Sequence, residues 1–367
     1  MLTEIRRKKI LLDFERMRDL YTGFYNFNLN FGRSLLKLAS DKFDFSFYMV
    51  PWQEGLFGKN NHYESETYTK SEKNRFVQFF QKEKKRGEYD IIHISDQHST
   101  FQPGDTKAKI ILTIHDLNYL TEESPDVKSI EKENQKHQRI IDKADHIVCI
   151  SNFSRDTVLA NLDIKNKPID VIYQGCTLEE LPVLNKPRYL PKRRFLFAIS
   201  NLYPKKNFHV LPCLLIGNDL ELIISGIVEH PRQRAYVKVI MENARMHGVA
   251  DRVIITGPVS DNEKQWYYKN CMAFMFPSLA EGFGIPPLEA MYFGKPVFAS
   301  TCTSIPEICG DVAYYFKSFE PAEMITVFKE GMLHYETVKP IQKIKDRHDF
   351  FSWDRTASAY IDLYEKL

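Results

Sequence analysis

The segment 276–297 places two carboxylates on either side of a glycine-containing loop. It reads FPSLAEGFGIPPLEAMYFGKPV, with Glu281 before the loop and Glu289 eight residues later. A carboxylate only accepts hydrogen bonds, so it suits the vicinal hydroxyl groups of a ribose or a hexose. The prolines after Gly284 open a helix, whose first backbone N–H groups favour a phosphate. Taken singly, Glu281 could cap a loop and Glu289 could complement a helix dipole, but the whole segment indicates a site for a sugar and a phosphate.

Two lysines and two histidines are further candidates for chemistry. Lys205 and Lys206 lie in a turn that follows an apolar run, where ammonium groups could neutralise a phosphate. A Lys-Lys pair is usually an exposed turn, and only its place after a strand favours binding. His115 ends another apolar run and precedes Asp116, and His98 is a weaker candidate of the same kind. A lone histidine is more often structural, so both interpretations stay open at this point.

These candidates follow short apolar runs that alternate with amphipathic stretches. Strands are predicted at 9–14, 45–50, 90–95, 109–115, 146–151, 169–174, 194–200, 221–226, 252–257, 273–278 and 296–300. Helices are predicted at 129–144, 152–161, 232–247, 262–270 and 287–293, and a last amphipathic helix at 351–367. Continuous Val, Ile, Leu and Phe runs separated by helices indicate parallel strands that are buried on both faces. The pattern predicts an α/β protein whose ligands bind at the carboxyl ends of strands.

The domain organisation follows from the length and from one irregular stretch. At 367 residues the chain suits two domains. The stretch 178–194 contains three prolines and no periodicity, as interdomain linkers do. We therefore expect a first domain at 1–180 and a second at 181–350, each doubly wound and Rossmann-like, facing each other across a cleft.

Composition excludes several classes of function. Lys+Arg 50 against Asp+Glu 48 gives a net charge of +2, so no nucleic-acid partner is expected. The basic runs 6–9 and 82–86 indicate solvated surface, or alternatively a weak attraction to an anionic membrane. The six cysteines form no Cys-x-x-Cys pair, and neither a signal peptide nor an 18-residue apolar run is present, so we expect a cytoplasmic protein, at most peripheral on the membrane. Asp-x-Asp, His-Glu-x-x-His and nucleotide-binding glycine motifs are missing too, so no metal and no cofactor are expected.

The chain resembles a known family. Segment 276–297 resembles the E-x7-E signature of the retaining GT-B glycosyltransferases of family GT4, also called glycosyl transferases group 1. Further stretches agree with the family in order and spacing: 109–117, 146–155, 203–207, 305–311 and 351–357. The resemblance covers nearly the whole chain and is closest to mannosyltransferase-like members. It implies a GT-B fold whose last helix, 351–367, completes the acceptor-side first domain, while 181–350 binds the donor.

The resemblance also implies roles for the candidate residues. Lys206, with Lys205, would hold the donor diphosphate, Glu289 would bind ribose hydroxyls, and Glu281 would contact the transferred sugar. The loop between the carboxylates would contact the donor through Gly282, Phe283, Gly284 and Ile285. The nucleobase would lie near the turn that contains Val259. His115 would approach the donor sugar from the first domain, so His115, Glu281 and Lys206 are the expected catalytic residues.

The first loop departs from the family pattern. Where the family has Gly-Gly-x-Gly after its first strand, residues 21–27 read YTGFYNF, with Gly23 as the one glycine. Gly23 still permits a close approach of the donor, and the aromatic residues hint at stacking on a sugar.

The activity that the resemblance implies is transfer of a hexose, with mannose the first guess, from a nucleotide sugar (GDP-mannose or a UDP-sugar) with retention. The acceptor would be a glycan or a lipid-linked saccharide in polysaccharide, O-antigen or lipopolysaccharide biosynthesis. No covalent nucleophile is expected, and the departing diphosphate would accept the proton. A nucleotide-sugar epimerase of the same architecture and a catalytically silent sugar-nucleotide-binding subunit are the alternatives.

Overall fold

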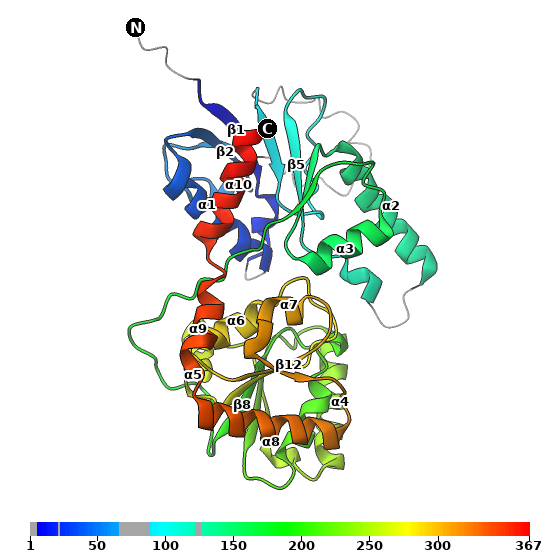
Figure 1. Cartoon of the computed structure of the whole chain (residues 1–367), viewed down its shortest axis with the longest axis vertical. Coiled ribbons are helices and arrows are strands. Elements are labelled where there is room, and N and C mark those ends of the chain that lie inside the picture. Colours follow the sequence, from blue (N-terminus) through cyan, green and yellow to red (C-terminus); the bar gives the residue numbers. More distant parts are fainter. Residues whose placement is uncertain (1–5, 21–22, 66–87, 122–125) are drawn as a thin grey trace. The chain divides into compact units, whose positions relative to one another are not determined.

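The computed structural model describes residues 6–20, 23–65, 88–121 and 126–367. The chain divides into two compact units (Figure 1). Unit 1 comprises Met1–Leu117, Asp126–Gly175 and Trp353–Leu367, and unit 2 comprises Asn118–Pro125 and Cys176–Ser352. The division therefore falls between Gly175 and Cys176, whereas the sequence predicts it at residue 180.

Unit 1 is built on a seven-stranded sheet in the order β3-β2-β1-β4-β5-β6-β7, and all of its recorded strand pairs are parallel. Its strands are β1 (Lys8–Asp13), β2 (Phe43–Tyr48), β3 (His62–Glu64), β4 (Ile91–Ile94), β5 (Lys109–Ile114), β6 (His146–Cys149) and β7 (Ile169–Val171). Among its described residues the helices are α1 (Gly23–Ala39), α2 (Val127–Lys143), α3 (Asn152–Asn161) and α10 (Trp353–Lys366). The strand order reverses between β1 and β4, so right-handed crossovers place α1 on one face and α2 and α3 on the other.

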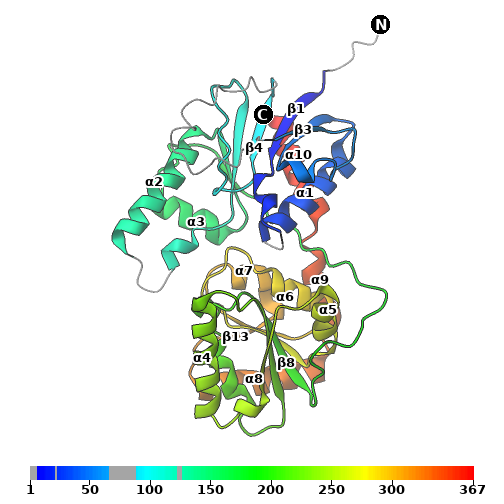
Figure 2. The same cartoon turned by 180° about the vertical axis from the view of Figure 1, so that it is seen from behind.

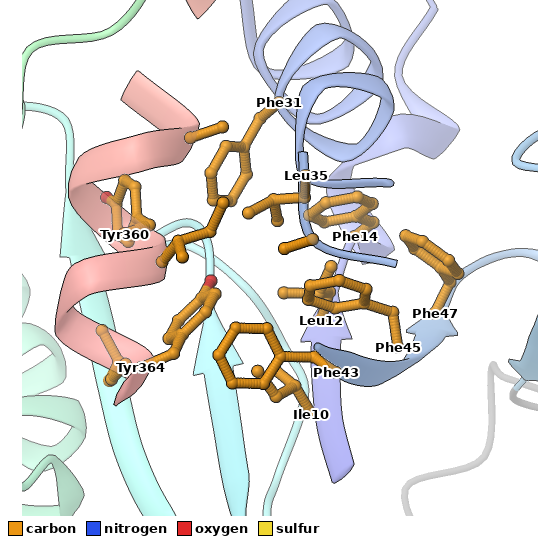
Figure 3. Packing of buried hydrophobic residues seen from close by; sticks show 14 of the residues in the cluster. Ile10, Leu12, Phe14, Phe31, Leu35, Phe43, Phe45, Phe47, Tyr360 and Tyr364 are labelled. Carbon is orange, nitrogen blue, oxygen red and sulfur yellow. The ribbon is translucent and has the colours of Figure 1, made fainter. Parts of the chain in front are cut away.

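The last helix of the chain completes the first core. Helices α1 and α10 lie side by side over the sheet in both views (Figures 1 and 2). Figure 3 shows Tyr360 and Tyr364 of α10 among the apolar side chains of α1, β1 and β2. The ring centroids of Phe31 and Tyr360 are 4.8 Å apart, and those of Phe43 and Tyr364 are 6.0 Å apart. Unit 1 is therefore discontinuous in sequence.

A series of buried hydrogen bonds between side chains connects α10 to the sheet. His93 of β4 bonds Tyr364 Oη through Nδ1 at 2.6 Å and Thr113 Oγ1 through Nε2 at 2.7 Å. Thr113 Oγ1 in turn lies 2.7 Å from Tyr360 Oη. Burial lowers the pKa of His93 to about 3, so the imidazole is neutral and can donate from one nitrogen and accept at the other.

Unit 2 is built on a six-stranded parallel sheet in the order β10-β9-β8-β11-β12-β13. Its strands are β8 (Phe195–Ile199), β9 (Glu221–Ser225), β10 (Val253–Gly257), β11 (Ala273–Phe276), β12 (Val297–Ser300) and β13 (Tyr314–Phe316). Its helices are α4 (Pro231–Met246), α5 (Asp261–Asn270), α6 (Ile285–Tyr292), α7 (Ile305–Cys309), α8 (Pro321–Val338) and α9 (Ile341–Asp349). A buried apolar cluster joins the sheet to α4, α8 and the 3₁₀ helix Phe208–Leu215, while α6 packs on β11 and β12 from the other face.

Two expectations from the sequence need correction. Residues 23–27 are not a loop, because α1 begins at Gly23 and Phe27 is already buried in the core; Tyr21 and Thr22 lie outside the described residues. The stretch 178–194 is irregular, as an interdomain linker would be, but it belongs to unit 2. Side chains of α5 hold it: Gln265 accepts from Leu181 N at 3.0 Å, and Asn262 accepts from Asn185 N at 2.8 Å.

Candidate functional site

The predicted donor residues of unit 2 lie on loops that leave neighbouring strands. The strands β8, β11 and β12 are adjacent and parallel, so their carboxyl ends meet at one edge of the sheet. The 3₁₀ turn Pro204–Lys206 follows β8, the loop 277–284 follows β11, and the segment 301–304 follows β12. This edge is where open parallel sheets bind ligands.

Lys206 and Glu281 form an ion pair at this edge. Lys206 Nζ lies 2.6 Å from Glu281 Oε1, and the two side chains are only 12% and 14% exposed. Backbone contacts join the same two loops, because the carbonyl of Lys205 accepts hydrogen bonds from Leu279 N at 2.8 Å and from Ser278 Oγ at 3.3 Å. The structure thus brings together the lysine turn and the first carboxylate.

Three hydroxyl groups, one at the end of β12 and two just after it, hold the loop that carries Glu281. Ser300 Oγ donates to the carbonyl of Ser278 at 2.5 Å, and Thr303 Oγ1 accepts from Glu281 N at 3.1 Å. Ser304 Oγ lies 2.9 Å from the carbonyl of Glu281 and 3.0 Å from that of Phe283. Thr303 has φ 54°, which is unusual for a β-branched residue and fits strain at a functional site. The sequence analysis missed these residues, although a cluster of Ser and Thr directly after a strand was a usable signal.

The helix α6 begins beyond Gly284, whose φ of 116° explains the glycine. Glu289 is the fifth residue of α6 and lies just beyond its first turn. Pro286 and Pro287 lack an N–H, so only Ile285 and Leu288 carry backbone donors in the first turn. The helix start therefore offers a phosphate fewer N–H groups than an ordinary helix.

Two side chains of α5 hold the carboxylate of Glu289. Lys264 Nζ lies 2.8 Å from Oε1, and Tyr268 Oη donates to Oε2 at 2.8 Å. Burial lowers the pKa of Lys264, but the attraction of Glu289 outweighs it and leaves that pKa raised. Burial and the same carboxylate raise the pKa of Tyr268, so the phenol keeps its proton and donates. Lys264 and Tyr268 were not predicted, although their spacing of four residues puts them on one face of α5.

Other predicted donor residues have different surroundings. The Phe283 ring is buried and packs edge-on against Phe351, with centroids 5.4 Å apart, so it belongs to the core. Gly282 is buried, while Ile285 is half-buried at the start of α6. Val259 is half-buried in the turn between β10 and α5.

The side chain of Arg188 holds the turn that contains Val259. Arg188 donates to the carbonyl of Pro258, and its Nε lies 3.1 Å from Glu263 Oε1. Burial alone would raise the pKa of Glu263, but hydrogen bonds from Arg188 and Ser260 bring it down to about 2.

Gly226, at the end of β9, is a further residue that the sequence analysis missed. A Cβ there would lie 1.8 Å from the carbonyl oxygen of Ser200, after β8. Gly226 N donates to the carbonyl of Gly257 at 2.9 Å, so three strand ends meet at this residue. Glycine at the end of a strand was the available signal.

His115 is buried in unit 1. Its Nε2 lies 2.9 Å from the carbonyl of Ser95 and therefore carries the proton, and its ring packs against Phe27 at 4.7 Å. Burial lowers the pKa of His115 despite the Ser95 hydrogen bond, which favours a neutral imidazole. Its expected approach to a donor sugar stays a prediction.

His98 and Gly23 lie at the same carboxyl edge of the unit 1 sheet. His98 N donates to Asp96 Oδ1 at 2.6 Å, and burial lowers the pKa of the imidazole to about 4 although Asp96 opposes the shift. Gly23 is exposed at the start of α1, with open space where a Cβ would lie. Phe24 beside it packs edge-on against His115, with ring centroids 5.1 Å apart, and its expected stacking on a sugar stays a prediction.

The described residues show neither a metal site nor a membrane span. No group of three or more His, Cys, Asp or Glu side chains in the described ranges is arranged to hold a metal ion. None of the helices in the described part of the chain has the length and hydrophobicity that crossing a bilayer requires. Two residues of the basic run 6–9 form ion pairs at the surface of unit 1: Arg6 pairs with Asp90 at 3.0 Å and Arg7 with Asp44 at 2.8 Å. The second basic run, 82–86, lies outside the described residues.

Comparisons with curated proteins return mannosyltransferases. The serotype-specific mannosyltransferase WbdA of Escherichia coli is 27% identical over 241 residues, which are 62% of this chain and 29% of that protein. This chain thus spans about 29% of the length of that relative. The O-antigen chain mannosyltransferase B of Escherichia coli is 28% identical over 71% of both chains. The alpha-1,3/1,6-mannosyltransferase ALG2 of Dictyostelium discoideum is 38% identical over 42% of this chain and 44% of that protein.

Comparisons with solved structures identify the fold, and family models identify the family. The sucrose-phosphate synthase from Thermosynechococcus elongatus superposes with a TM-score of 0.74 at 16% identity, over 98% of this chain and 99% of that one. The lipopolysaccharide outer core galactosyltransferase WaaB in its apo form has a TM-score of 0.67 at 19% identity, over 98% of this chain and 100% of that one. The model of Glycosyltransferase Family 4 matches residues 62–180, and that of Glycosyl transferases group 1 matches residues 185–330. The chain therefore has the GT-B fold and belongs to glycosyltransferase family 4.

Proposed function

We propose that the protein is a retaining glycosyltransferase that moves a hexose from a nucleotide sugar to a saccharide acceptor. The observation that carries the proposal is the Lys206–Glu281 pair at the carboxyl edge of the unit 2 sheet, on a loop that hydroxyl groups hold in place. A cation and a carboxylate side by side suit a donor that joins a diphosphate to a polyol. The mannosyltransferase relatives support the same class of reaction.

The pair suggests how the donor is bound and activated. Lys206 would exchange its contact with Glu281 for the donor diphosphate, and Glu281 would turn to a hydroxyl of the sugar. As the bond between the sugar and the diphosphate breaks, positive charge develops on the sugar ring and negative charge on the leaving group. Lys206 stabilises the leaving diphosphate, which accepts the proton of the acceptor hydroxyl as the new glycosidic bond forms on the same face. The positive charge comes from Lys206, and we propose that neither a metal nor a cofactor is required.

The relatives favour mannose and a bacterial surface polysaccharide. An O-antigen chain mannosyltransferase RfbU of Salmonella typhimurium is also similar, at 25% identity over 57% of each chain. We therefore propose GDP-mannose as the first donor to test and a glycan or lipid-linked saccharide of O-antigen type as the acceptor. A UDP-sugar is the second choice, because a structural neighbour, HepE of Anabaena, was solved with UDP-glucose. Peripheral membrane contact stays a proposal.

The test is release of free nucleotide from a panel of GDP-, UDP-, ADP- and TDP-sugars, without acceptor and with EDTA. Selective slow release from one donor supports the transferase and identifies both base and sugar. Conversion of a donor to an isomeric nucleotide sugar would show an epimerase instead. If folded protein leaves every donor intact even after an acceptor screen, the silent sugar-nucleotide-binding subunit is the better assignment.

A further inference from the structure

The Glu289 carboxylate is held by a protein side chain on each of its two oxygens. Lys264 takes Oε1 and Tyr268 takes Oε2, each at 2.8 Å. The Glu289 side chain is 13% exposed and that of Lys264 is 24% exposed, whereas Tyr268 is fully buried. Since Lys264 and Tyr268 are one turn apart on α5, they fix the plane of the carboxylate from one side.

The geometry leaves a defined acceptor capacity. A carboxylate has about four lone-pair positions, two on each oxygen. Lys264 and Tyr268 occupy one position on each oxygen, so each oxygen keeps one more for a ligand. Two parallel acceptors on adjacent oxygens match two hydroxyl groups on neighbouring carbons.

We propose that Lys264 and Tyr268 are positioning residues that orient Glu289 to bind a vicinal diol, so that the site selects ribonucleotides over 2′-deoxyribonucleotides. The inference rests on the proposed function, because it takes the ligand to be a nucleotide sugar. Lys264 supplies the charge that a partly buried carboxylate needs. Tyr268 prevents the carboxylate from turning toward Lys264 and placing both oxygens on the ammonium group.

The experiment measures equilibrium binding of GDP and 2′-deoxy-GDP, and of UDP and 2′-deoxy-UDP, to the full chain by calorimetry. For the wild type we expect the ribonucleotide of the preferred base to bind roughly tenfold more tightly than its 2′-deoxy form, the effect of one hydrogen bond to a charged group. In Tyr268→Phe we expect the preference to fall to about twofold or less, mainly through weaker binding of the ribonucleotide.

The matched control for Tyr268→Phe is Tyr267→Phe. Tyr267 is the neighbouring tyrosine of α5, equally buried, and its Oη donates to the carbonyl of Tyr189 at 2.7 Å rather than to Glu289. Both variants lose one buried phenol hydrogen bond, so both are destabilised to a similar degree. Only Tyr268→Phe should change the ratio of ribonucleotide to deoxyribonucleotide affinity, which a merely structural role would leave unchanged.

Lys264 provides an independent second test. Lys264→Met should lower the preference as Tyr268→Phe does, and Lys264→Arg should restore part of it. The control Lys269→Met removes a lysine of the same helix that pairs with Glu180 at 2.9 Å, and it should leave the preference unchanged. The lysine variants test the proposed positioning roles even if Tyr268→Phe does not fold.

The outcomes separate this inference from the proposed function. If the wild type binds no nucleoside diphosphate, the proposed function fails and the inference fails with it. If the wild type binds ribonucleotide and deoxyribonucleotide equally, or if folded Tyr268→Phe and Lys264→Met keep the full preference, the positioning roles are wrong while the proposed function stands.

Discussion

At the scale of single residues, the two neighbouring lysines of unit 2 differ in what they contact. The Lys206 ammonium group pairs with the Glu281 carboxylate in a partly buried site. The backbone carbonyl of Lys205 instead accepts a hydrogen bond from the neighbouring loop. Only Lys206 is therefore placed to exchange a carboxylate for a phosphate.

We expect Lys206→Met to lower donor turnover by roughly 10- to 100-fold, because hydrogen bonds to a charged group contribute about 1.5–3 kcal/mol. Lys205→Met should lower it by less than about threefold, since its backbone contacts remain. Steady-state rates with the preferred donor measure the difference, and circular dichroism shows that both variants are folded. Equal losses in the two variants would contradict the distinction.

Asp13 gives a prediction about pH. It ends β1, is 1% exposed, and its Oδ2 has no hydrogen-bond partner among the described residues. Burial raises the pKa of Asp13 to about 7, although hydrogen bonds from Ser99 and Glu15 oppose the shift. Between about pH 4 and pH 7 the unfolded chain releases this proton and the folded protein does not, so the free energy of unfolding falls as the pH rises.

Asp13→Asn removes this ionisation. The variant should gain stability relative to the wild type as the pH rises, by about 2–3 kcal/mol between pH 5 and pH 8. Urea unfolding at both values measures it. An advantage that does not change with pH would show that Asp13 ionises freely in the folded protein.

The sequence predicted some residues of the site and not others, for a physical reason. Glu281, Glu289 and Lys206 belong to local motifs, and two of them turn out to pair with each other. Lys264 and Tyr268 reach the Glu289 carboxylate, and Thr303 and Ser304 reach the backbone of the Glu281 loop, only because the sheet order places their elements side by side. One sequence without its strand order contains no such information.

At the scale of elements, periodicity identified every described strand except β3 and β13. Each of these two edge strands has only three residues, which is too few to show a pattern by itself. The edge strand β7 is equally short, but it was predicted within the longer run 169–174. Helix α1 was missed because its start was taken for a loop, although Phe27, Phe31 and Leu35 recur every four residues and all are buried. Helix α3 was predicted with the bounds that the structure shows.

The strand ends of unit 2 give a prediction about packing. Gly226→Ala would force a Cβ onto the carbonyl of Ser200, and the backbone there has φ 153°. We expect a loss of at least about 3 kcal/mol in the free energy of unfolding. Gly248→Ala is the matched control, because φ is 68° but nothing lies within 4 Å of the new Cβ, so it should cost only about 1 kcal/mol. Similar losses in both variants would mean that the loop moves to admit the methyl group.

At the scale of the whole molecule, the two units depend differently on the end of the chain. Helix α10 contributes Trp353, Tyr360 and Tyr364 to the core of unit 1, whereas unit 2 is built from residues before Trp353. The irregular stretch marked the division in the sequence, but its attachment to α5 through side chains could not be predicted.

A chain that stops after Ser352 should therefore lose the fixed structure of unit 1 and keep unit 2. We expect limited proteolysis to degrade residues before Gly175 while a fragment beginning near Cys176 survives. That fragment should still bind the preferred nucleoside diphosphate, within about tenfold of the full chain. Cooperative loss of both units, or survival of both, would contradict the division.

The place of α10 also has a consequence for synthesis on the ribosome. The strands of unit 1 leave the ribosome first, but the helix that covers one of their apolar faces follows only after the 177 residues of Cys176–Ser352 have been made. At a synthesis rate of about 5–20 residues per second, that apolar face stays uncovered by α10 for roughly 10–35 s. During this interval unit 2 can fold while unit 1 stays incomplete, so the nascent chain presents Phe31, Phe43 and their neighbours to chaperones.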